Sequence, residues 1–372
     1  MNQPSDKKVD AQKTGKGFDP DVDLSSAAAT LTSDQKKELW NFIGERREML
    51  QEDMCLHPGA NCSGVICNAH SIQESKLSEI ARAGQVYCFE FDPGKAVKNP
   101  LAETFTRLHI GKVSVFRGFC STHDANLFRP IETEDFKCTP EQLFLFFYRA
   151  ICRELHVRHC IAKAHVTAEE IARMHPTIPR DNYEAAVGWL QTRSCEEAFR
   201  LHFFKSKVDA TLLNAEFRRL KHYVITFKRQ PSVLSAAAFS PTSDFEGRRL
   251  RLVRHPLLPY PIMTITTLPT LSGGVAILSW FDNGPAEFEQ FCSSLETLPV
   301  DKLTSSLIRL LFEFCDNIAI APVWWDALSS DSKNALLNHA RSGTSSDRMN
   351  ESCLTEDGLC YDDWEVEMRF RL

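Results

Sequence analysis

The chain has 372 residues, of which 43% are hydrophobic and 25% are charged, as is usual for a folded globular protein. Its formal net charge of −6 excludes a protein that is basic over its whole surface. No apolar run approaches the ~20 residues that span a bilayer, and residues 1–31 lack the apolar region of a signal peptide. We therefore expect a cytoplasmic protein of two or three domains that makes no membrane contact.

The cysteines point to metal ligation. The chain contains 13 of them, an odd number in a long chain without a secretion signal. In a reducing compartment such cysteines are more often free thiols or metal ligands than disulfides.

The N-terminal part divides into a polar tail and a helix. Residues 1–31 are rich in Lys, Asp, Ser and Ala without apolar periodicity, so we expect them to be disordered. A helix is predicted from Ser33 to about Gln51. Its apolar positions are Leu39, Trp40, Phe42, Ile43 and Leu50. This helix opens a predicted unit of residues 32–138.

Short elements follow within this unit. Val65-Ile66 begins a predicted strand that reaches His70, and Ser75–Ala83 is predicted to form helical turns that end at Gly84. Val86–Phe91 alternates as a strand does. Lys112–Phe119 is predicted to be a loop.

Residues 139–221 form a predicted helical region. Thr139-Pro-Glu-Gln142 has the form of a capping box with proline at the first helical position. The strongly apolar segment Leu143–Arg158 is the predicted helix behind it. Asp181 to about Lys221 is predicted to form one or two long helices.

Residues 222–341 form a predicted C-terminal α+β domain, because short β-like runs are followed by helical segments. The predicted strands lie at Tyr223–Phe227, Val233–Phe239, Leu250–Val253, Ile262–Leu268 and Val275–Phe281. The predicted helices lie at Pro285–Leu295, Val300–Phe314 and Trp324–His339. The overall fold class is therefore α+β.

Residues 342–372 form an acidic tail, with eight acids and three bases from Gly343 onward. We expect this tail to be dispensable for folding, because it lacks a continuous apolar face. The alternative is an edge strand, since Trp364, Val366, Met368 and Phe370 alternate with polar residues.

Two ligand pairs predict one tetrahedral zinc ion. Cys120-x-x-His123 has the compact spacing of a zinc knuckle. Its partner pair is drawn from four residues that precede it, namely Cys55, His57, Cys62 and Cys67. We prefer Cys55 and Cys62, because a turn at Pro58-Gly59 folds the intervening residues back. Cys67 then remains an ordinary buried thiol. The alternative for the whole set is that several of these cysteines are small core residues.

The segment Cys55–Glu132 also carries a resemblance. It contains the ligand pairs, the motif Ala69-His-Ser-Ile-Gln73, and the motif Gly118-Phe-Cys-Ser-Thr-His-Asp-Ala-Asn-Leu-Phe-Arg-Pro-Ile-Glu132. This order resembles the HNH endonuclease superfamily, whose ββα-metal core is treble-clef-like. It is also similar to an uncharacterised group of bacterial proteins that share both motifs.

The resemblance implies a zinc-stabilised, metal-dependent endonuclease that hydrolyses phosphodiesters, in a setting such as genome defence. By motif position, His70 is the general base that removes a proton from water, and Asp124 is a ligand of a catalytic Mg²⁺ or Mn²⁺. Asn126 is expected to orient His70 or the water. The segment Lys95–Arg117 has five basic residues and one acid, so we expect a loop there that contacts nucleic acid.

A non-catalytic function is the alternative. Ala69 occupies the position before the base histidine, where the superfamily usually has a metal-binding Asp or His. His70 would then be a buried histidine bonded to the backbone. In that case the protein is an inactive, zinc-stapled binding or sensor module.

Overall fold

The computed structural model describes residues 51–89, 105–163, 169, 180–252, 261–344 and 352–372. Within these residues one antiparallel sheet of eight strands dominates, in the order β10-β5-β8-β7-β6-β9-β2-β3. The strands are β2 (Gln85–Phe89), β3 (Phe105–His109), β5 (Leu220–Phe227), β6 (Val233–Phe239), β7 (Met263–Thr270), β8 (Gly273–Phe281), β9 (Ile318–Ile320) and β10 (Val366–Arg371). Helices cover both faces, so the protein is of the predicted α+β class.

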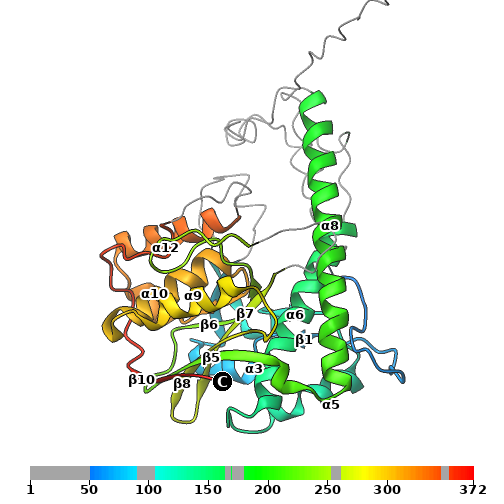
Figure 1. Ribbon diagram of the computed structural model, residues 1–372, viewed down its shortest axis with the longest axis horizontal. Coiled ribbons are helices and arrows are strands. Elements are labelled where there is room, and N and C mark those ends of the chain that lie inside the picture. The colour runs from blue at the N-terminus through cyan, green and yellow to red at the C-terminus, as the bar shows by residue number, and fades with distance from the viewer. Residues whose placement is uncertain (1–50, 90–104, 164–168, 170–179, 253–260, 345–351) are drawn as a thin grey trace, which may run out of the picture.

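One face of the sheet carries α9 (Ala286–Glu296), α10 (Val300–Phe314) and α12 (Ser330–Thr344), as Figure 1 shows. Successive strand residues alternate between the two faces. Tyr223 and Ile225 of β5 therefore pack with these helices, whereas Val224 between them packs on the opposite side. The central strands are buried on both faces. Strand β8 is accordingly almost wholly apolar, whereas β7 also buries Thr264, Thr266 and Thr267.

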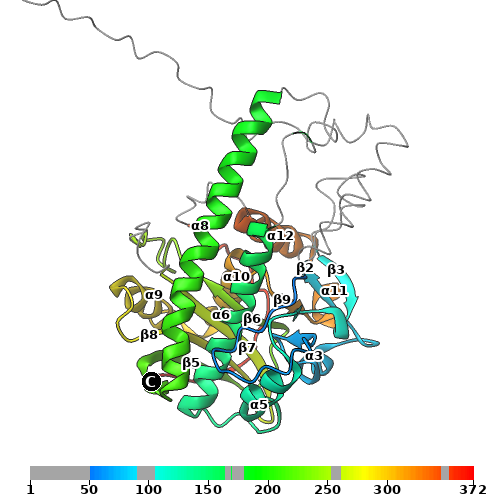
Figure 2. The same cartoon turned by 90° about the vertical axis from the view of Figure 1, so that its right-hand side faces the viewer.

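The other face of the sheet carries α6 (Pro140–Lys163), and α8 (Arg180–Leu213) packs on α6. The predicted cap of α6 is present, because the Gln142 backbone amide donates to Thr139 Oγ1 at 3.2 Å. Figures 1 and 2 show α8 extending beyond the body of the protein.

The predicted helices agree well with the observed ones. The segment predicted at Trp324–His339 forms two helices, α11 (Pro322–Ala327) and α12, because the backbone leaves the helical region at Leu328. The predicted strand at Leu250–Val253 is wrong for the part that the structure describes, where residues 250–252 lie outside any strand. None of the described helices is long and apolar enough to cross a membrane.

The segment around the predicted zinc ligands forms a second, two-stranded sheet and two helices. The strands are β1 (Ala69–His70) and β4 (Val115–Phe116), which pair antiparallel. The helices are α3 (Glu74–Ile80) and α5 (Ser121–Glu132). The predicted loop Lys112–Phe119 therefore contains strand β4.

The sheet crosses the predicted domain boundaries. Strand β2, from the predicted unit 32–138, pairs with β9 from the predicted domain 222–341. Strand β10, from the predicted tail 342–372, pairs with β5 of the same domain. Backbone hydrogen bonds thus unite segments that composition alone separates, because strand pairing does not depend on proximity in sequence.

The C-terminal tail is docked on the sheet, which contradicts the reason for expecting it to be dispensable, namely that it has no apolar face to pack. Trp364 is 1% exposed and its ring meets that of Phe227 edge to face at 5.1 Å. Its Nε1 atom donates to Ser232 and Asp362. An edge strand, the alternative that the sequence offered, is present as β10 (Val366–Arg371). Trp364 lies just before it, and a bulge between Val366 and Met368 interrupts the predicted alternation, so that Met368 is exposed.

Some predictions concern residues that the structure does not describe. The N-terminal segment 1–31 and the helix predicted from Ser33 to Gln51 lie outside the described residues, apart from Gln51. The same holds for residues 95–104 of the basic segment. Its remaining part, 105–117, is not a loop, because it contains β3, a 3₁₀ turn and β4.

His222 makes the stability of the sheet depend on pH. It is 4% exposed, and its Nδ1 atom lies 2.8 Å from Ser279 Oγ on the neighbouring strand. Burial lowers the pKa of His222 to about 4. The unfolded chain therefore binds this proton at a higher pH than the native one, so stability falls as pH drops from 6.5 towards 4.

We expect the free energy of unfolding to fall by about 2 kcal/mol more between pH 7.5 and pH 5 in the wild type than in His222→Gln. Urea unfolding of both proteins at the two pH values measures this difference. Acid effects on the other histidines and on bound metal are shared by both proteins and cancel. Equal pH dependence in the two would contradict the assignment.

Candidate metal centre

Four soft donors meet where the loop before β1 contacts the start of α5. The ligand atoms of Cys55, Cys62, Cys120 and His123 all lie within 4.8 Å of one another. These are the residues that the spacing predicted. Tetrahedral zinc with Zn–S bonds of ~2.3 Å requires ligand atoms about 3.8 Å apart. A modest contraction would therefore satisfy zinc, and the Cys₃His donor set is one that zinc prefers in structural sites.

The first ligand pair lies on an extended loop fixed by backbone hydrogen bonds. Leu56 N donates to Gly118 O at 2.9 Å, and Cys67 N donates to Phe119 O at 3.0 Å. These bonds hold the loop against the residues just before Cys120 and so bring the two ligand pairs close together.

The second pair lies at the start of α5. Cys120 is the N-cap, and its Sγ accepts a bond from the His123 backbone amide at 3.5 Å. Burial acts to raise the pKa of Cys120, but hydrogen bonds from Ser63 and His123 lower it to about 5. These hydrogen bonds favour the thiolate of Cys120, the form that binds metals.

His57 and Cys67, the other candidate ligands, have different roles. The His57 ring stacks on that of His123 with centroids 3.9 Å apart, and its Nδ1 accepts from Gly59 N. His57 therefore packs against the ring of the candidate ligand His123 and helps to fix its orientation. Cys67 Sγ points to the Phe119 carbonyl at 3.5 Å, and burial raises the pKa of this thiol to about 11.

A buried lysine anchors the same loop to the helical layer. Lys205 Nζ donates to the Leu56 carbonyl at 2.7 Å and to Tyr148 Oη at 3.0 Å. Its charge is balanced by Asp209 one turn further along α8. The sequence showed no sign of this contact, because Lys205 looks like part of a solvated helix face.

His70, the predicted general base, lies on β1. Its Nε2 atom is buried and has no hydrogen-bond partner among the described residues. Burial lowers the pKa of His70, while the charge of Glu74 and a hydrogen bond to the Ile110 backbone act to raise it. Since Nε2 is unpartnered, that bond is made by Nδ1, which leaves the Nε2 lone pair free to accept a proton.

Arg149 and Glu132 stand beside this histidine. The Arg149 side chain is almost completely buried, donates to Glu132 at 2.5 Å, and covers the Phe128 ring at 4.0 Å. Its Nε atom has no partner among the described residues. The charges of both Arg149 and Glu132 act on His70. Sequence reasoning missed Arg149, which lies within an apolar helix.

Asp124 lies in the first turn of α5, directly after the predicted zinc ligand His123. Burial raises its pKa, and the charge of Arg149 opposes that shift. Helical rise places Asp124 and Glu132 about 12 Å apart along α5. Arg149 therefore bonds Glu132 directly and acts on Asp124 only through its charge.

Asn126 does not share this face. It is exposed, and two helical residues place it about 200° around α5 from Asp124. The predicted role of Asn126 in orienting His70 therefore has no geometric support.

Two of the three described cations of the basic segment are paired, whereas Lys112 is exposed and has no ion pair among the described residues. Arg107 bonds Asp326 and lies over the Tyr87 ring at 4.9 Å. Arg117 makes a two-pronged contact with Asp53. These pairs leave little free positive charge in the described part of Lys95–Arg117.

A polar network ties the paired strands β1 and β4 to the large sheet. Ser71 Oγ lies 2.5 Å from Ser114 Oγ, and Asn317 Nδ2 donates to Ser71 Oγ at 2.9 Å. Asn317 also donates to the Ala236 carbonyl on β6 at 2.7 Å. Ser71, the residue after β1, is thereby held by Ser114 beside β4 and by Asn317 beside β6.

Comparisons with known proteins assign no family. No family model matches the chain, and no similar curated protein or solved structure was found. Function must therefore be inferred from the site itself.

Proposed function

We propose that this protein is a divalent-metal-dependent nuclease whose zinc centre is a scaffold. The observation that carries the proposal is the free, buried Nε2 of His70 beside Arg149 and Glu132. A histidine with its other nitrogen held by the backbone suits a general base. The arrangement of β1, β4 and α5 above a Cys₃His cluster supports the resemblance to ββα-metal nucleases.

In this proposal each side chain has one task at the phosphodiester. His70 Nε2 takes a proton from the water whose oxygen forms the new bond to phosphorus, while the ester P–O bond breaks. Arg149 stabilises the negative charge of the phosphate, since its guanidinium is already positioned by Glu132 and Phe128.

A Mg²⁺ or Mn²⁺ ion, when bound, would neutralise phosphate and leaving-group charge. Glu74 and Glu132 are the carboxylates whose charges act on His70, and we assign them as the ligands that would hold this metal ion. In this proposal they replace the metal-binding residue that the HNH superfamily usually has at the position of Ala69. Asp124, the ligand implied by the resemblance, is the competing assignment, and Asp124→Asn beside Glu132→Gln separates the two.

The test is cleavage of DNA and RNA by the full chain with Mg²⁺ or Mn²⁺. We expect His70→Ala to lower the rate by about 10²-fold or more while zinc content stays unchanged. His109→Ala is a matched control, because this nearby histidine serves only as the cap of a 3₁₀ turn. If neither DNA nor RNA is cut, or if His70→Ala cuts as fast as the wild type, the nuclease proposal fails. The zinc-stapled binding module would then be the better account.

A further inference from the structure

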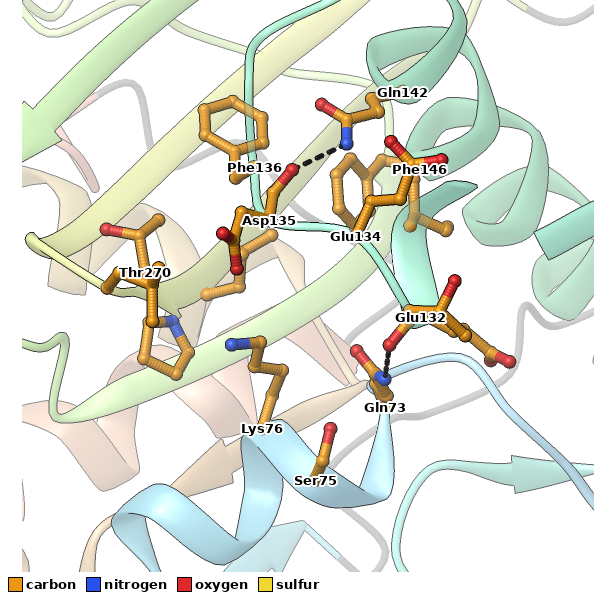
Figure 3. Close-up of a pocket in the computed structure, with 15 residues that line it drawn as sticks. Gln73, Ser75, Lys76, Glu132, Glu134, Asp135, Phe136, Gln142, Phe146 and Thr270 are labelled. Carbon is orange, nitrogen blue, oxygen red and sulfur yellow. Dashed lines mark hydrogen bonds between the residues drawn. The ribbon is translucent and has the colours of Figure 1, made fainter. Parts of the chain in front are cut away.

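A small cavity opens beside the His70 cluster, where the zinc-binding segment meets the large sheet. Its volume is about 130 Å³. Four segments line it, namely the start of α3, the end of α5 with the loop that follows, α6, and the end of β7 with the turn to β8. Figure 3 shows side chains from these segments around the opening.

The cavity adjoins the His70 cluster, which consists of His70, Glu74, Glu132 and Arg149, because Glu132 belongs to both. Gln73 Nε2 donates to the Glu132 backbone carbonyl at 2.8 Å, and both residues line the cavity. The Glu132 carboxylate points instead to Arg149. A nucleic-acid strand with its phosphate at His70 would therefore place a neighbouring nucleotide at this opening.

The lining favours a base over a phosphate. Glu134 and Asp135 place negative charge at the cavity, which repels an anion. Phe136, Phe146 and Pro269 supply flat or apolar surface on which an unpaired base can lie.

Two polar side chains define which base would fit. The Asp135 carboxylate has no hydrogen-bond or ion-pair partner in the part of the chain that the structure describes, whereas Glu134 is paired with Lys137 at 3.3 Å. Lys76, also paired with Glu79, reaches into the opening from α3 (Figure 3). A free carboxylate accepts two parallel N–H bonds, and an ammonium donates to a carbonyl oxygen.

We propose that this cavity binds an unpaired guanine base of the substrate, a proposal that rests on the nuclease function. Guanine alone among the common bases presents a carbonyl oxygen next to two N–H donors on its pairing edge. The N–H groups would face Asp135 and the carbonyl would face Lys76. The substrate would accordingly be single-stranded, since pairing hides this edge.

The test is direct binding of nucleoside 5′-monophosphates to the full-length protein by calorimetry, without cleavage. We expect GMP to bind about tenfold more tightly than AMP, CMP or UMP. Asp135→Asn should remove this preference, because an amide cannot accept both N–H bonds. Glu134→Gln is the matched control and should keep it. Equal affinity for all four nucleotides, or a GMP preference that survives in Asp135→Asn, would overturn the proposal.

His70→Ala separates this proposal from the nuclease function. The variant should bind GMP as the wild type does, because His70 does not line the cavity. Preferential GMP binding by a protein that cuts nothing would leave the guanine site standing and remove the nuclease. Cleavage without preferential GMP binding would support the nuclease function and rule out the guanine site.

Discussion

Cys120→Ser should reduce bound zinc from close to one ion per chain to almost none, and it should destabilise the protein severely. Cys120 is buried, caps α5 and has its thiol within reach of the other three donors. Structural zinc sites contribute ~10 kcal/mol or more of apparent binding free energy, part of which is folding free energy. Elemental analysis of protein purified without added metal, followed by thermal unfolding, measures both effects.

Cys67→Ser is the control for this experiment. Cys67 lies close to the cluster in sequence, but its thiol bonds a backbone carbonyl. The variant should therefore keep its zinc. A wild-type protein that is fully folded and free of metal would contradict the assignment, as would equal zinc loss in the two variants.

Trp364→Ala should cost about 3–5 kcal/mol of unfolding free energy, the usual range for truncating a buried tryptophan. The substitution removes the contact with Phe227 and the two hydrogen bonds of Nε1. It also leaves Asp362 and Ser232 without this donor in a buried setting. Chemical denaturation of the purified full chain measures the change.

Met368→Ala is the control, because Met368 lies on the same tail and is 56% exposed. Its effect should stay within about 0.5 kcal/mol. Limited proteolysis of the wild type should also spare the tail. A tail that is removed without loss of stability would show that the packing around Trp364 is not formed in solution.

The local features of this fold were accessible from sequence. The cap at Thr139 and the long helix behind it follow from residue types within a few positions of one another. The four candidate ligands were accessible for the same reason, since a knuckle spacing and a Pro-Gly turn are short-range signals. The strands β6, β7 and β8 were found because they are short β-like runs with Pro and Gly residues between them.

The long-range features were not accessible. The pairing of β2 with β9 joins segments from two predicted domains, and no residue in either strand specifies the partner. Arg149 reads as one polar position on an apolar helix until the fold brings it to Glu132. Likewise, Lys205 acquires its role only when α8 lies against the Leu56 loop.

The order of strands in the sheet has a consequence for synthesis on the ribosome. Strand β7 pairs with β6 and β8, its neighbours in sequence, and β5 can join β8 once β8 is made, so this part of the sheet can form as it emerges. Strand β2 must wait for β9, and β5 keeps an open edge until β10 arrives. During that interval the nascent chain exposes backbone groups that invite wrong pairing. Assembly of this sheet should therefore be slow, and it should depend on β10, which follows all the other strands of the sheet in the chain.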